Sequence, residues 1–150
     1  MAEESKFYEP VDGMKMPRFG AMPTFMRLPH IADFNAVDIA LTGVPWDGGT
    51  TNRAGARHGP REIRNMSSFM RRTHHALGIC PYELCRIADV GDVSVNPIDV
   101  NDTIVRVEDF FCEMHEAGAV PLSAGGDHLI TLPIMRAIAR QDPVGMIHFD

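Results

Sequence analysis

The chain has 150 residues, 45% of them apolar and 23% charged, which is typical of a soluble globular domain with a buried core. Its formal net charge is −6, from 14 basic and 20 acidic residues, so we expect no nucleic-acid partner, because phosphate binding needs a positive surface. No apolar run approaches the roughly 18 residues that span a bilayer, and the first residues are polar rather than a secretory signal. We therefore expect a cytoplasmic protein without a membrane partner. The three cysteines lack the spacing of a metal finger and predict free thiols, with a Cys80–Cys85 disulfide or a catalytic cysteine as alternatives.

Residues 1–35 are predicted to form an extended, proline-rich arm, because four prolines prevent a long helix. The arm is too apolar for a free tail. We expect its apolar residues to lie either on the body of the domain or on a neighbouring subunit, and these residues are Phe19, Met22, Phe25, Met26 and Leu28. Residues 36–150 are predicted to be the N-terminal half of a single α/β domain, since the chain stops on the aspartate of a predicted buried strand.

The rest of the chain alternates predicted strands and helices. The first strand, 37–44, carries little charge and suits a sheet that is buried on both faces. A glycine-rich loop over 46–59 follows, and Pro60 begins a predicted helix that runs to Met70.

A second strand is predicted over 84–90, with Asp89 and Asp92 interpreted mainly as turn residues that cap backbone N–H groups. The clearest helical periodicity starts at Val100 and ends at Gly118, which is typical of a C-terminal cap. A strand over 120–124, a helix over 129–140 and a strand over 144–149 complete the chain. Alternating strands and helices predict the α/β class with a mainly parallel sheet.

The chemistry is expected where two of these strands end. A glycine turn after the strand 120–124 leads into Asp127 and His128, and the strand 144–149 ends in Asp150. Parallel neighbouring strands would place His128 and Asp150 on one rim, close enough to share a metal ion, and an imidazole with a carboxylate suits Mn²⁺, Zn²⁺, Fe²⁺ or Ni²⁺. Asp127 is placed to orient these groups. Taken alone, His128 is more often a hydrogen-bonded structural residue than a ligand.

Three segments in order, 43–64, 125–133 and 146–150, resemble the ureohydrolase family of arginases and agmatinases, most closely its guanidinobutyrase and guanidinopropionase branch. The resemblance implies a three-layer α/β/α fold of the arginase type, of which this chain would be the N-terminal half. It also implies a centre of two Mn²⁺ ions, with Ni²⁺ or Zn²⁺ as alternatives, in which His128 is a ligand and Asp150 a bridging ligand. The other ligands and the proton-transfer residues would lie beyond residue 150, and His148 is interpreted as structural.

The same resemblance implies hydrolysis of a small linear guanidino compound to urea and an amine. Leu129, in place of a serine common in the family, favours 4-guanidinobutanoate or 3-guanidinopropanoate over agmatine or guanidine. The substrate's tail is expected near the loop formed by Thr50, Thr51, Asn52 and Arg53. Arg53 or Arg57 is a candidate partner for a substrate carboxylate, although structural ion pairing is the stronger expectation.

A homo-oligomer, trimeric or hexameric, is also implied. The alternative of another class is a non-catalytic paralogue that serves as an assembly or regulatory subunit. A nucleotide-binding domain is a weaker alternative, because Gly125 and Gly126 lack the glycine spacing of a dinucleotide-binding loop.

Overall fold

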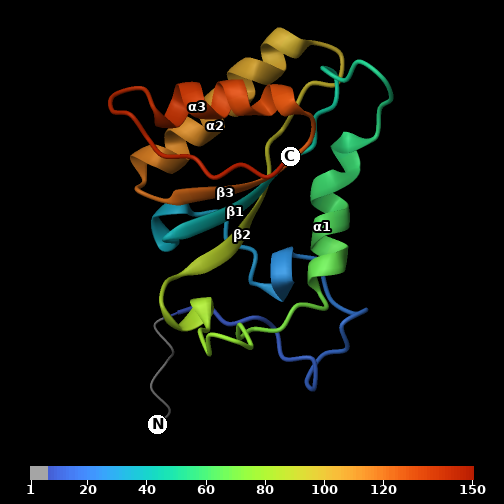
Figure 1. Ribbon diagram of the computed structural model, residues 1–150, viewed down its shortest axis with the longest axis vertical. Helices are drawn as coiled ribbons and strands as arrows, with labels where there is room; N and C mark the ends of the chain where they lie inside the picture. The colour runs from blue at the N-terminus through green and yellow to red at the C-terminus, as the bar shows by residue number, and fades with distance from the viewer. Residues whose placement is uncertain (1–6) are drawn as a thin grey trace.

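A computed structural model describes residues 7–150 and shows a parallel sheet with strand order β2-β1-β3 (Figure 1). Helix α1 lies on one face of this sheet, and helices α2 and α3 pack together on the other. The strands are β1 (Ile39–Val44), β2 (Ile87–Asp92) and β3 (Val120–Gly125), and the α-helices are α1 (Gly59–Ser67), α2 (Val100–Glu116) and α3 (Thr131–Ile138). Short 3₁₀ turns are η1 (Phe25–Arg27), η2 (Phe34–Ala36), η3 (Ala56–His58), η4 (Pro81–Glu83) and η5 (His128–Ile130). The predicted α/β class and parallel sheet are confirmed.

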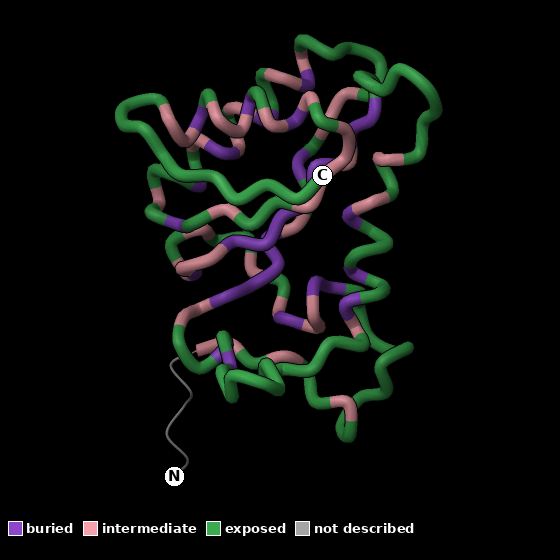
Figure 2. The backbone as a smooth tube through the Cα atoms, viewed as in Figure 1, coloured by how far each residue is buried: buried purple, intermediate pink, exposed green. Residues whose placement is uncertain are grey.

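The central strand β1 and the helix α2 form the core of the molecule. Ala40 and Val44 on β1 are fully buried, as are Phe111 and Met114 on α2, which lies against the sheet (Figure 2). Burial on both faces of β1 follows from its lack of charged residues, as the sequence predicts.

Helix α2 begins at the predicted Val100 and ends just before the predicted cap, Gly118. The Asp99 carboxylate accepts hydrogen bonds from the N–H groups of Asn101 and Asp102 and caps the first turn. Gly118, just past the last turn, has φ +79°, a conformation that favours glycine and ends the helix. None of the helices within residues 7–150 is both long enough and apolar enough to cross a membrane. All three cysteines are free thiols, as predicted.

Helix α1 buries a charged side chain and exposes its large apolar ones, which is the reverse of the usual amphipathic helix. It ends at Ser67 rather than at the predicted Met70, and the residues it buries are Pro60, Arg64 and Ser67. Its apolar side chains, including Ile63 and Met66, are exposed. The reason is that α1 faces two carboxylates of β2, so one of its charged residues, Arg64, lies inside and binds both of them.

The described part of the arm, residues 7–35, is irregular apart from η1 and η2, and residues 1–6 lie outside the described part of the chain. Phe25 and Leu28 are buried on the body of the domain. His30 forms a parallel bridge with Asp89, so the arm adds to the free edge of β2. Phe19, in contrast, is 96% exposed, and Met22 is also exposed. The arm therefore contacts the body through only part of its apolar surface.

The predicted strand over 144–149 is wrong in this structure, because these residues have no regular secondary structure. Figure 1 shows the segment, in red, running beside β3 towards the C-terminus. A strand needs a ladder of backbone hydrogen bonds, and apolar composition alone does not supply one. Ile147 and Phe149 are exposed here, so burial does not hold the segment either.

Candidate metal and substrate site

The candidate site lies at the carboxyl ends of β1 and β3, where two loops start side by side. Val44, the last residue of β1, pairs with Gly125, the last residue of β3. The loop after β1 and the turn after β3 therefore leave the sheet next to each other, and this edge of a parallel α/β sheet is where ligands commonly bind. His128 is the first residue of η5 and projects from the second of these segments.

His128 and Asp150 lie together, although no strand carries Asp150. The His128 Nδ1 atom is 3.4 Å from the Asp150 Oδ2 atom, and both side chains are exposed. The His148 ring lies 5.0 Å from the His128 ring. His148 is interpreted as structural from the sequence, and with no strand over 144–149 its ring lies at the same corner as the His128 ring.

The donor atoms at this corner are a partial set for a metal ion. An imidazole nitrogen and a carboxylate oxygen, both reachable from solvent, suit the first-row divalent ions. Within residues 7–150, no group of three or more histidine, cysteine, aspartate or glutamate side chains is arranged so that it could hold a metal ion. The pair therefore fits as part of a metal site, and two ligands are too few to hold an ion tightly.

Asp127 bonds to the loop rather than to the ring of His128. Its Oδ2 atom accepts a hydrogen bond of 2.6 Å from the Gly49 N–H, and its Oδ1 atom accepts one of 3.0 Å from the Leu129 N–H. The second bond caps η5, and the first joins this turn to the glycine-rich loop. Asp127 thus orients the His128 turn through the backbone.

The loop itself is built around Asp47, a residue that sequence reasoning missed. The buried Asp47 carboxylate accepts hydrogen bonds from the Gly55 N–H at 2.7 Å and from the Arg57 Nε–H at 2.6 Å, and it forms an ion pair with Arg57. These bonds, the side-chain bond from Arg57 foremost, lower the pKa of Asp47 far below its ordinary value. Two of the donors are backbone N–H groups eight and ten residues away, and a pattern of side chains in the sequence does not predict such bonds.

The Asp47–Arg57 pair shows which of the two loop arginines has a structural role and which remains a candidate partner for a substrate carboxylate. Arg57 is held by Asp47, which agrees with the expectation of structural ion pairing. Arg53 is exposed, as are Thr51 and Asn52. Thr50 donates its hydroxyl hydrogen bond to the Asp47 carbonyl, at 2.9 Å, inside the loop. The predicted substrate loop therefore presents Thr51, Asn52 and Arg53 to solvent beside the His128 turn.

A second charged cluster lies along β2, between α1 and the arm. Arg64 binds Asp89 and Asp92, and the Arg64 guanidinium lies 4.2 Å from the centre of the Phe25 ring. A hollow of about 350 Å³ is lined by these charged residues together with Met22, Pro23, Thr24, His30, Arg61 and Gly91. The interpretation of Asp89 and Asp92 as mainly turn caps was incomplete. Asp89 does accept the Gly91 N–H, but its main partner is Arg64.

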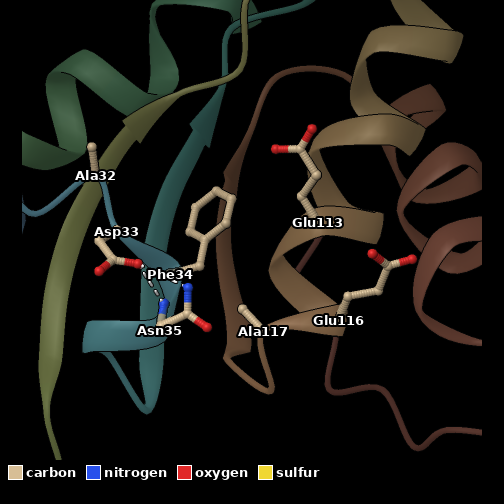
Figure 3. A pocket seen from close by; sticks show the side chains of 7 residues that line it. All are labelled: Ala32, Asp33, Phe34, Asn35, Glu113, Glu116 and Ala117. Atoms are coloured by element: carbon tan, nitrogen blue, oxygen red, sulfur yellow. Dashed lines mark hydrogen bonds between the residues drawn. The ribbon is translucent and has the colours of Figure 1, made fainter.

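A further hollow, of about 480 Å³, lies near the opposite ends of the strands (Figure 3). Asp33, Glu113 and Glu116 line it, and Ala117 precedes the start of β3. The Asp33 carboxylate accepts bonds from the backbone and side chain of Asn35, which lower the pKa of Asp33. Because this hollow lies at the amino ends of the strands, it is separate from the His128 corner.

Comparisons with known proteins show the family to which the chain belongs. The arginase family profile matches residues 37–150. Guanidinopropionase of Pseudomonas aeruginosa is 59% identical over 142 residues, which cover 95% of this chain and 45% of that protein. Guanidinobutyrase of the same organism is 42% identical over 151 residues, covering 98% of this chain and 47% of that protein. The chain thus spans about half the length of these relatives.

Solved structures of the family share the fold. Proclavaminate amidino hydrolase from Streptomyces clavuligerus superposes with a TM-score of 0.79 and 38% identity, over 83% of this chain and 42% of that one. A formiminoglutamase variant from Trypanosoma cruzi, crystallised with Mn²⁺, gives a TM-score of 0.63 and 25% identity, over 71% of this chain and 37% of that one. The chain therefore belongs to the arginase family, on its guanidinobutyrase- and guanidinopropionase-like branch.

Proposed function

We propose that the protein hydrolyses a small linear guanidino compound to urea and an amine, with 4-guanidinobutanoate or 3-guanidinopropanoate as the favoured substrate. The observation that carries this proposal is the approach of His128 and Asp150 to 3.4 Å at the carboxyl end of the sheet. The names of the two relatives, guanidinopropionase and guanidinobutyrase, support the substrate class.

The chemistry requires an activated water, because a guanidinium carbon is resonance-stabilised and a poor electrophile. His128 and Asp150 would hold part of a centre of two divalent ions, with Mn²⁺ favoured by analogy with the Mn²⁺-containing formiminoglutamase and Ni²⁺ or Zn²⁺ as alternatives. Such ions, when bound, lower the pKa of a water molecule and hold it in place. Asp127 keeps the backbone on either side of His128 in position.

The exposed part of the loop would border the substrate's tail. Thr51 and Asn52 offer hydrogen-bonding groups, and Arg53 offers a positive charge that complements a substrate carboxylate. Leu129, beside His128, is consistent with a guanidino acid rather than agmatine or guanidine as substrate.

We also propose that the protein is a cytoplasmic homo-oligomer, a trimer or hexamer, that uses its exposed apolar surface as an interface. Ile63 and Met66 on α1 are exposed, and Phe19 and Met14 on the arm are more than nine-tenths exposed. Large exposed apolar patches are typical of contacts with another protein, and these side chains are our candidates for such a patch.

The test is urea release by the full-length protein after loading with Mn²⁺, Ni²⁺ or Zn²⁺ in turn. The substrates are 4-guanidinobutanoate, 3-guanidinopropanoate, agmatine and guanidine. We expect urea from at least one of the two guanidino acids, and a preference for agmatine or guanidine would correct the substrate class. No urea from any compound with any metal would reject the hydrolase and favour the non-catalytic paralogue.

A pair of variants tests the assignment of the metal ligand. His128→Asn should lower the bound metal per subunit, measured by elemental analysis, and abolish urea release. His115→Asn removes an exposed imidazole from α2, away from the sheet edge, and should leave both unchanged. Equal metal content in the two variants would show that His128 is not a ligand.

A further inference from the structure

The glycine-rich loop is closed upon itself by a single carboxylate. Asp47, at its beginning, accepts the backbone N–H groups of Gly55 and Arg57 and the Arg57 side chain. The bonds join residues eight and ten positions apart, so the chain between them is a closed ring. The exposed residues expected to meet the substrate lie on this ring, and its shape is set from inside by a charge that solvent does not reach.

The ring is attached to the His128 turn by a second carboxylate. Asp127 uses one oxygen for the Gly49 N–H, on the ring, and the other for the Leu129 N–H, directly after His128. Residues 49 and 127 are 78 positions apart in the chain. One side chain therefore spans the two elements and fixes the backbone on both sides.

Backbone contacts support the same attachment. The Asp127 N–H donates to the Trp46 carbonyl at 2.7 Å, and the Gly126 N–H donates to the Ala56 carbonyl at 3.4 Å. A methyl group on Gly126 would meet the carbonyl oxygens of Val44 and Trp46. The turn is thus seated against the loop near both ends of the ring, with no space for a side chain between them.

We propose that Asp47 and Asp127 are positioning residues that couple the substrate loop to His128, so that the loop's conformation and the metal affinity depend on each other. The structural part of this coupling stands on the hydrogen bonds alone, whereas its catalytic meaning rests on the proposed function. Loss of the Asp47 ring would release Gly49, and Asp127 would then hold the His128 turn through one bond instead of two. Conversely, loss of the Asp127 bond would leave Gly49 without its side-chain link to the turn, and the middle of a loop almost eighty residues earlier in the sequence would loosen.

The experiment compares three variants of the full-length protein, Asp47→Asn, Asp127→Asn and the control Asp99→Asn, which makes the same exchange at the cap of α2, where one side-chain oxygen accepts both bonds and Asn can still supply it. Hydrogen–deuterium exchange reports on residues 48–57, and calorimetric titration with Mn²⁺ reports on the metal site. Asp127→Asn should speed exchange in the loop. Asp47→Asn should weaken Mn²⁺ binding by about tenfold, the lower end of what the loss of an outer support costs a metal site. Asp99→Asn should change neither reading.

Arg57→Lys serves as a second variant in case Asp47→Asn does not fold, because it keeps the positive charge and loses the Nε donor. Arg57→Lys should change the loop's exchange rate and the Mn²⁺ affinity in the same direction as Asp47→Asn, by smaller amounts. The coupling is overturned if Asp127→Asn leaves the loop's exchange unchanged, or if Asp47→Asn and Arg57→Lys both loosen the loop without affecting Mn²⁺ affinity. Neither reading requires urea release, so the coupling and the proposed reaction succeed or fail separately.

Discussion

Arg64 on α1 binds Asp89 on β2 through two hydrogen bonds, from Nε to Oδ2 at 2.7 Å and from Nη2 to Oδ1 at 2.9 Å. The Asp89 side chain is 1% exposed, and it also accepts the backbone N–H groups of Phe25 and Gly91. One buried carboxylate therefore joins the arm, the helix and the edge strand. The other Arg64 amino group binds Asp92, so each of the three guanidinium nitrogens donates a hydrogen bond to a carboxylate.

Removing the positive partner should be costly, because it leaves Asp89 charged and buried. We expect Arg64→Met to lower the free energy of unfolding of the full-length protein by about 3–5 kcal/mol, the usual cost of breaking a buried pair from one side. The control is Arg106→Met, which breaks an exposed pair with Asp102 on α2 and should cost less than about 1 kcal/mol. Urea denaturation measures both. Similar losses would show that the buried pair contributes no more than a surface one.

The same pair predicts a dependence of stability on acid. Burial alone would raise the pKa of Asp89, but the bonds from Arg64, Phe25 and Gly91 outweigh it and lower that pKa. A carboxyl whose pKa is lower in the folded state stabilises the protein above its unfolded pKa, about 4, and this contribution is lost as the pH falls further.

Thermal unfolding between pH 6 and pH 3 checks the sign. The wild-type melting temperature should fall steeply below about pH 4. The Asp89→Asn variant should have a lower melting temperature at pH 6 and a smaller fall towards pH 3, because the asparagine does not bind a proton in this range. Parallel curves for the two proteins would show that Asp89 does not titrate differently in the folded state.

The sequence predicts those parts of the fold that are determined locally. Strand β1 follows from an uncharged apolar run, and α2 from its helical periodicity and from Gly118 at its end. In contrast, the inward face of α1 depends on Asp89, which is 25 residues away from Arg64. No periodicity reveals that contact, so the apolar residues of α1 suggested a buried face that is in fact exposed.

The candidate site divides in the same way. The sequence predicts that His128, just after the glycine turn, and Asp150 lie on one rim of the sheet. The two side chains do lie close together in the structure. Asp47 could not be found, because the path of the loop alone brings its partners close, and these are the backbone N–H groups of Gly55 and Arg57 together with the Arg57 side chain. The strand expected over 144–149 failed because a strand depends on a bonded neighbour as well as on composition.

The exposed apolar face of α1 predicts a defined effect on assembly. Met66→Lys places a charge on this face, in the last turn of α1, and should reduce the molar mass of the full-length protein in solution, measured by light scattering after gel filtration. Ile98→Lys is the matched control, because Ile98 is 94% exposed in the loop before α2. If both variants keep the wild-type mass, this face is not the interface.

Gly126 predicts how strictly the His128 turn is constrained. Its φ of +72° is unfavourable for other residues, and an added methyl group would meet the carbonyl oxygens of Val44 and Trp46. We expect Gly126→Ala to cost at least about 1–2 kcal/mol, the price of a left-handed conformation alone, with a further cost from the contact. Gly145→Ala adds the same methyl group where nothing lies within 4 Å, and should change the stability little. Thermal unfolding of the two variants gives the comparison, and an unchanged melting temperature for Gly126→Ala would mean that the turn moves away from the loop at little cost.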